Sequence, residues 1–148
     1  MTGPRTTRVE PWTASVARRP ACHVQADAPP GALLDAFVGA ARRGRLRVVV
    51  DGLRARATRG ARLGGLVAEM LLLPVGHLWA LLEVHVDEHA APDAPHGREL
   101  RVVCVAGERE PGNAAKVARI LDDTVARLEA GGAGPVQILP WARALDAP

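Results

Sequence analysis

Aromatic residues are scarce in this chain of 148 residues: they make up 3% of it, with no tyrosine, one phenylalanine and three tryptophans. A hydrophobic core must therefore be built from leucine, valine, isoleucine and alanine. Hydrophobic residues reach 48% of the chain, which is enough for one globular domain. A chain of this length needs neither a metal nor a disulfide to form its core, so we expect no cofactor.

Cysteine is also rare. Cys22 and Cys104 are the two cysteines, and they do not form a C-x-x-C pair. This number is too small for a disulfide framework, and it favours a reducing, cytoplasmic setting. Residues 1–10 contain no apolar stretch typical of a signal peptide. A glutamate, a proline and a histidine interrupt the longest apolar region, residues 65–82, so we expect no membrane span.

The residues of common enzyme motifs are largely missing. Ser15 is the single serine, and it is not part of a nucleophile elbow. The glycine-rich segment 60–65 (GARLGG) lacks the Lys-Ser/Thr pair that a phosphate-binding loop requires. We therefore do not expect an enzyme.

Charge is distributed unevenly along the chain. Residues 1–66 carry twelve arginines and four acids, whereas residues 67–148 carry seven basic residues and twelve acids. Single-sign surfaces steer charged partners, so the asymmetry is typical of a partner-binding face. Two solvated faces that attract one another would give the same pattern.

Hydrophobic periodicity predicts alternating strands and helices. The expected helices cover residues 33–41, 63–71, 77–89 and 114–128, and the expected strands cover residues 22–28, 46–50, 100–106 and 136–139. Alternation of this kind predicts an α/β fold with a small parallel β-sheet flanked by helices, of three strands plus a possible extra N-terminal strand. The expected organisation is an N-terminal arm and βα extension (1–44), a main domain (45–141) and a C-terminal tail (142–148).

Several segments match one family in order. These are VVVDG at 48–52, LLLP at 71–74, GHLWALL at 76–82, the helix at 114–128 and VQIL at 136–139. In this order the chain resembles the barstar family, the intracellular inhibitors of barnase-type ribonucleases. The resemblance implies a barstar-like fold and an inhibitor or antitoxin whose partner is a ribonuclease or another basic protein toxin.

The resemblance also implies a binding surface. Pro74, Gly76 and Trp79 match the proline, the glycine and the apolar residue of the family's motif. The positions of the family's asparagine and its two inhibitory aspartates hold Leu78, Ala80 and Val84. The partner-binding residues implied in this way are Gly76, His77, Leu78, Trp79, the nearby acids Glu83, Asp87 and Glu88, and Asp123 on the later helix.

Two other functions remain open. The first is a non-inhibitory protein-interaction module on the same fold. The second is a zinc-dependent hydrolase, because HVDEH at 85–89 matches H-x-x-E-H, with His85 and His89 as ligands and Glu88 as general base. Solvated histidines at a helix end explain the same pattern, so we expect no metal site.

Arginines form a basic stretch with Asp51 as its only acid; they are Arg42, Arg43, Arg45, Arg47, Arg54, Arg56, Arg59 and Arg62. Nucleic acid or an acidic partner could neutralise this stretch. Because no aromatic residue interleaves with the arginines, a base-stacking platform is absent. We therefore expect a solvated basic face and no nucleic-acid partner.

Overall fold

The computed structural model describes residues 9–13, 19–59, 80–87, 98–107, 111–133 and 136–143. Within these residues, two helices and six strands follow one another in the order β-α-β-β-β-β-α-β. Their bounds are β1 (Pro20–Ala26), α1 (Pro30–Arg43), β2 (Arg47–Asp51), β3 (Arg54–Arg59), β4 (Ala80–Val86), β5 (Arg98–Ala106), α3 (Pro111–Ala130) and β6 (Gln137–Arg143).

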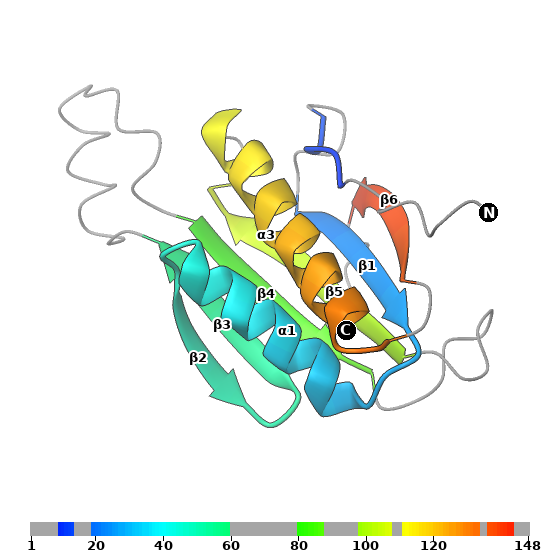
Figure 1. Cartoon of the computed structure of the whole chain (residues 1–148). Coiled ribbons are helices and arrows are strands. Elements are labelled where there is room, and N and C mark those ends of the chain that lie inside the picture. Colours follow the sequence, from blue (N-terminus) through cyan, green and yellow to red (C-terminus); the bar gives the residue numbers. More distant parts are fainter. Residues whose placement is uncertain are drawn as a thin grey trace, which may run out of the picture.

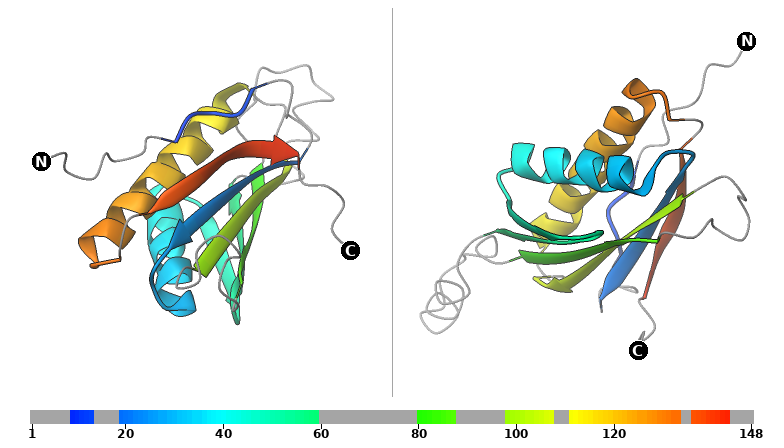
Figure 2. Two further views of the ribbon diagram at one scale, coloured as in Figure 1. Left: turned by 90° about the vertical axis from the view of Figure 1, so that its right-hand side faces the viewer. Right: turned by 90° about the horizontal axis from the view of Figure 1, so that it is seen from below.

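The six strands form one sheet in the order β2-β3-β4-β5-β1-β6. Every neighbouring pair is antiparallel. Both helices lie on the same face of the sheet, as the front view and the view from below show (Figures 1 and 2). The first strand is inserted between β5 and β6, so segments far apart in the sequence lie side by side in the sheet.

The antiparallel sheet corrects the expected fold. Residues 46–50, 100–106 and 136–139 do contribute to strands, which are β2, β5 and β6. However, β2 turns back at Gly52, whose φ is +59°, and pairs with β3 instead of continuing into a helix. The prediction of a parallel, barstar-like sheet is therefore wrong. Its error began at residues 54–59 (RARATR), where no strand was expected.

The expected helix at 77–89 is also wrong, because the described part of it is the strand β4. Leu82, Val84 and Val86 are at most 2% exposed and face the helices, while Glu83 and His85 alternate with them on the other face. This is a period of two, which is typical of a strand. The spacing of Leu82 and Val86 also fits one helical turn, so the two periods are ambiguous over so short a segment.

The first and last expected helices are confirmed. Residues 33–41 lie within α1, which ends before Gly44 as expected, and residues 114–128 lie within α3. The apolar stripes of these two helices cover the sheet and meet in one core with β1, β4 and β5. The helix expected at 63–71 lies outside the described residues.

A short N-terminal segment closes one side of the core. Val9 and Trp12 are 5% and 8% exposed, and residues 9–13 run alongside α3 near β6 (Figure 2). The Trp12 and Trp141 rings are in edge-to-face contact, with centroids 4.9 Å apart. Trp141 Nε1 also donates to the Glu10 carbonyl oxygen at 2.8 Å. No helix in the described ranges is long and apolar enough to cross a membrane.

Candidate functional site

An open depression lies where the C-terminal end of α1, the end of β3 and the first half of α3 come together. Its volume is about 470 Å³. Its lining residues are Ala40, Arg43, Gly44, Arg59, Lys116, Arg119, Ile120 and Asp123. Four of these eight residues are cationic and come from three different elements, so we call this feature the basic depression.

The turn after α1 places one of these cations. The N–H of Gly44 donates to the Ala40 carbonyl oxygen at 2.9 Å, and the N–H of Leu46 donates to the Ala41 carbonyl oxygen at 3.0 Å. Arg45 adopts a left-handed φ of +65° between them, which reverses the chain within three residues. The tight turn brings the start of β2 back beside the end of α1 and keeps Arg43 at the rim of the depression.

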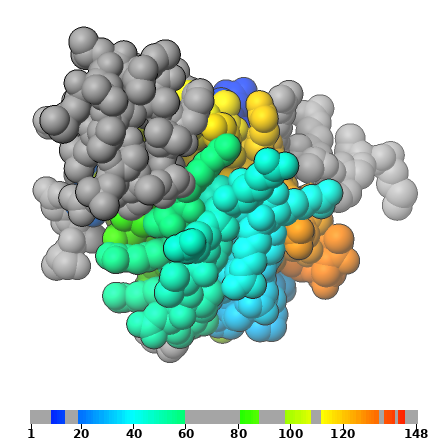
Figure 3. All heavy atoms as spheres, turned by 90° about the vertical axis from the view of Figure 1, so that its left-hand side faces the viewer, coloured from blue at the N-terminus to red at the C-terminus, as the bar shows by residue number. Residues whose placement is uncertain are grey.

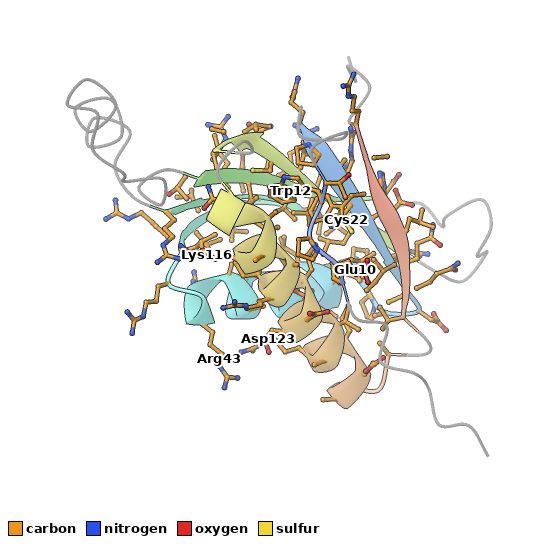
Figure 4. The ribbon with its side chains drawn as sticks, turned by 90° about the horizontal axis from the view of Figure 1, so that it is seen from above. Glu10, Trp12, Cys22, Arg43, Lys116 and Asp123 are labelled. Carbon is orange, nitrogen blue, oxygen red and sulfur yellow. The ribbon has the colours of Figure 1, made fainter. Side chains whose placement is uncertain are left out.

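The two helices approach one another closely at this point. A Cβ atom on Gly44 would lie 3.1 Å from Ile120 Cγ1, which is tighter than ordinary van der Waals contact. The absence of a side chain therefore lets the end of α1 pack directly on α3. In Figure 4, Arg43 on α1 lies on the same side of the molecule as Lys116 and Asp123 on α3.

The cations of the basic depression repel one another. Partial burial, followed by the positive charges of Arg59 and Arg119, lowers the pKa of Lys116 below its ordinary value of 10.5. Asp123, the one acid among the lining residues that the structure describes, accepts a hydrogen bond from Arg127 Nε at 3.3 Å. Its charge is thus shared with an arginine that does not line the depression. A bound anion would relieve this repulsion.

Helix dipoles explain only part of the cluster. Arg42 and Arg43 occupy the last turn of α1, where the dipole favours positive charge. Lys116 and Arg119 lie in the N-terminal half of α3, where the dipole does not favour cations. Their position next to Arg59 needs another explanation, and ligand binding provides one.

The positive surface continues beyond the depression. Arg42, Arg45 and Arg47 are exposed at the same end of the molecule. Long side chains of α1 and of the β2–β3 hairpin stand out from this side in the space-filling view (Figure 3). The described arginines of the predicted basic stretch are exposed, except for the half-buried Arg59, and Arg62 lies outside the described residues.

The structure does not bring together the three predicted acidic residues that it describes. Glu83 points away from the helices and forms an exposed ion pair with Arg56 at 3.1 Å. Asp87 follows the end of β4, and its backbone N–H donates to the Glu99 carbonyl oxygen at 2.9 Å. Asp123 lies on α3 in the basic depression. The remaining residues of the predicted surface, Gly76, His77, Leu78, Trp79 and Glu88, lie outside the described residues.

The H-x-x-E-H interpretation assumed a helix, and His85 lies on a strand instead. Glu88 and His89 lie outside the described residues. Across the described ranges, no three His, Cys, Asp or Glu side chains group closely enough to hold a metal ion.

A second polar cluster lies on the open face of the sheet, opposite the helices. Glu99 Oε1 lies 2.5 Å from His23 Nδ1, and Glu99 Oε2 accepts a hydrogen bond from Gln25 Nε2 at 3.0 Å. Gln25 is only 6% exposed, so this carboxylate satisfies a buried amide and links β1 to β5. The cluster has a structural role that needs no ligand.

Sequence reasoning identified Arg43 and Arg59 but missed Lys116 and Arg119. A usable signal was present, because Lys116, Arg119 and Asp123 follow at steps of three and four and so share one face of the expected helix. Only the fold shows that this face borders the end of β3.

Comparisons of the chain with protein-family models, curated proteins and solved structures find no match.

Proposed function

We propose that this protein binds a small ligand bearing phosphate groups in the basic depression. The observation that carries this proposal is the convergence of Arg43, Arg59, Lys116 and Arg119 on one depression, whose described lining contains a single acid, Asp123. Guanidinium groups match phosphate oxygens in a bidentate geometry, and a lysine adds a point charge. A ligand with several negative charges would be held by several of these side chains at once.

The lining also limits what kind of ligand fits. A volume of about 470 Å³ lies in the range of small-molecule sites. Among the described residues that line it, the apolar part consists of Ala40 and Ile120, and none is aromatic. A nucleobase would find no ring to stack on among these described residues. The ligand that fits best is therefore a polyphosphate or a phosphorylated sugar, with Asp123 available to accept a hydrogen bond from a hydroxyl group.

Calorimetric titration tests the proposal. The probes are inorganic phosphate, pyrophosphate, tripolyphosphate and ribose 5-phosphate, at matched ionic strength to separate binding from general screening. Affinity is expected to increase with the number of phosphate charges. The Lys116→Gln and Arg119→Gln variants are each expected to weaken binding by about tenfold or more, because each removes a charge-assisted hydrogen bond.

Arg42→Gln is the matched control, since Arg42 is an exposed arginine of α1 that does not line the depression. It should bind the probes as the unchanged protein does. Two results would contradict the proposal: no binding of any probe at millimolar concentration, or binding that Arg42→Gln weakens as much as Arg119→Gln. A preference for duplex DNA or polyglutamate over the probes would instead indicate a macromolecular partner for the wider basic surface.

Inhibition of a ribonuclease, and the more general role of an interaction module, stay predictions from the sequence. The fold that the barstar resemblance implied is wrong, and of its predicted binding residues only Glu83, Asp87 and Asp123 are described. A cytoplasmic location likewise stays a prediction from the small number of cysteines.

A further inference from the structure

The strand β2 forms one edge of the sheet. It pairs with β3 on one side, and no described strand or helix pairs with it on the other. An edge strand presents alternate N–H and C=O groups that can pair with another strand. Figure 3 looks toward this edge, and residues of β2 and β3 lie open to view there.

The two edges of the sheet differ in their protection. The opposite edge strand, β6, contains Pro140 and has a register irregularity in its pairing with β1. Both features discourage further pairing. The strand β2 has no proline or glycine, and its five pairs with β3 run without a register shift. Its Val49 and Val50 are the large hydrophobic residues exposed in the described part of the chain, at 63% and 46%.

The sequence of β2, RVVVD, is complementary in charge to itself when reversed. We propose that two copies of this chain associate through their β2 edges, as antiparallel neighbours centred on Val49. Arg47 of each copy then lies opposite Asp51 of the other, and Val49 lies opposite its own equivalent. Opposite charges and β-branched pairs directly across an antiparallel ladder are stabilising.

The side-chain directions along β2 are consistent with this register. Val48 and Val50 lie opposite two buried alanines of β3 and so share the helix-covered face. Arg47, Val49 and Asp51 therefore share the open face. Directly opposed residues of an antiparallel pair lie on the same face, so both ion pairs and the central valine pair would form there.

Association in this register leaves the basic depressions apart. Arg43 and the start of β2 lie at one end of the edge, and the turn at Gly52 lies at the other. Because the two strands run in opposite directions, the basic end of one copy lies beside the hairpin turn of the other. Both sites stay open, and this inference does not depend on the proposed ligand.

Cysteine cross-linking tests the register directly. In Val49→Cys the two new thiols would lie opposite one another, at a Cα separation that a disulfide can span. In Val50→Cys each new thiol would face Val48 of the second copy and be too far from its equivalent to bond. The native Cys22 and Cys104 are both 0% exposed and do not compete.

Under mild oxidation we expect a covalent dimer from Val49→Cys and little or none from Val50→Cys, as judged by non-reducing electrophoresis. Sedimentation of the unchanged chain should show a dimer that dissociates on dilution. Equal cross-linking of the two variants, or a chain that stays monomeric at every concentration, would overturn the proposal.

Charge reversal provides a second readout. Arg47→Asp places two aspartates opposite one another at both ends of the contact, and should raise the dissociation constant by about tenfold or more. The double variant Arg47→Asp with Asp51→Arg restores opposite charges and should recover dimerisation. Circular dichroism verifies that each variant is folded. An unchanged dissociation constant for Arg47→Asp would show that another surface holds the copies together.

Discussion

At the scale of single residues, Cys22 shows how burial controls reactivity. Its side chain is 0% exposed in β1, an inner strand of the sheet, and its Sγ donates a weak hydrogen bond to the Leu139 carbonyl oxygen at 3.5 Å. Burial raises the pKa of this thiol from 9.0 to about 12. The thiolate, which is the reactive form, is thus almost absent near neutral pH.

The Cys22 thiol should therefore resist labelling in the native protein. In mildly alkaline buffer, Ellman's reagent is expected to label neither Cys22 nor the equally buried Cys104, and to label both in concentrated guanidinium chloride. Asp35→Cys, at an exposed position of α1 away from the β2 edge, serves as the positive control. Rapid labelling of the unchanged native chain would contradict the burial of these thiols.

The same pKa shift gives a pH dependence of stability. The folded-state pKa is raised, so the stabilisation is complete below pH 9.0 and is lost as the pH rises from there toward about 12. Over that interval the unfolded state releases the Cys22 proton and the folded state keeps it. Chemical denaturation across this range should show a smaller decline for Cys22→Ala than for the unchanged chain.

At the scale of elements, a buried amide joins the start of α3 to the end of β5. Asn113 is 1% exposed, and its Nδ2 donates to the Gly107 carbonyl oxygen at 2.9 Å. Gly107 has a φ of +78°, a conformation that side-chain-bearing residues rarely adopt. This hydrogen bond links the first turn of α3 to the residue that follows β5.

Asn113→Leu should destabilise the protein by about 1–3 kcal/mol, because it leaves the Gly107 carbonyl group without this donor. Thr124→Val is the matched control at a second buried polar residue of the same helix. Thr124 Oγ1 donates to the Ile120 carbonyl oxygen at 2.8 Å, an acceptor that already receives the helical N–H, so the loss should be smaller. Urea denaturation measures both changes. Equal losses would show that the Gly107 contact has no special role.

The element scale also shows where sequence patterns mislead. The strand β3 alternates arginine with alanine. Its arginines suggested a solvated basic segment, although the alternation itself is the period of two that is typical of a strand. Its alanines at 55 and 57 are 4% and 0% exposed, so small residues complete the helix-covered face of the sheet. Alanine has a weak preference for strands, which explains why the pattern was missed.

At the scale of the whole molecule, segments from both ends of the chain share one hydrophobic core. Val9 and Trp12 near the N-terminus and Val136 near the C-terminus belong to the same cluster as Phe37 on α1. A single core predicts that the described elements unfold together. Fluorescence and far-ultraviolet circular dichroism should therefore report the same unfolding midpoint.

Phe37→Ala tests this cooperativity. Phe37 is the single phenylalanine and is 0% exposed, so its truncation should cost about 3–5 kcal/mol and lower the midpoint by both probes equally. Asp35→Ala, at an exposed position of the same helix, should change stability little. Separate midpoints for the two probes would show that the core is divided into independent units.

The sequence by itself determined what short-range chemistry controls: the helices α1 and α3, most of the strand segments, the aliphatic core and the excess of arginine. Tertiary structure decided the direction and order of the strands and the extended conformation of β4. It also decided that Arg43 and Arg59 lie beside Lys116 and Arg119. A hydrophobic period of two or of 3.6 residues predicts which residues share one face of a strand or helix, but it does not predict which strand lies next to it. That choice depends on pairing between residues distant in sequence, such as Pro20–Ala26 with Arg98–Ala106, and on which arrangement buries the most apolar surface.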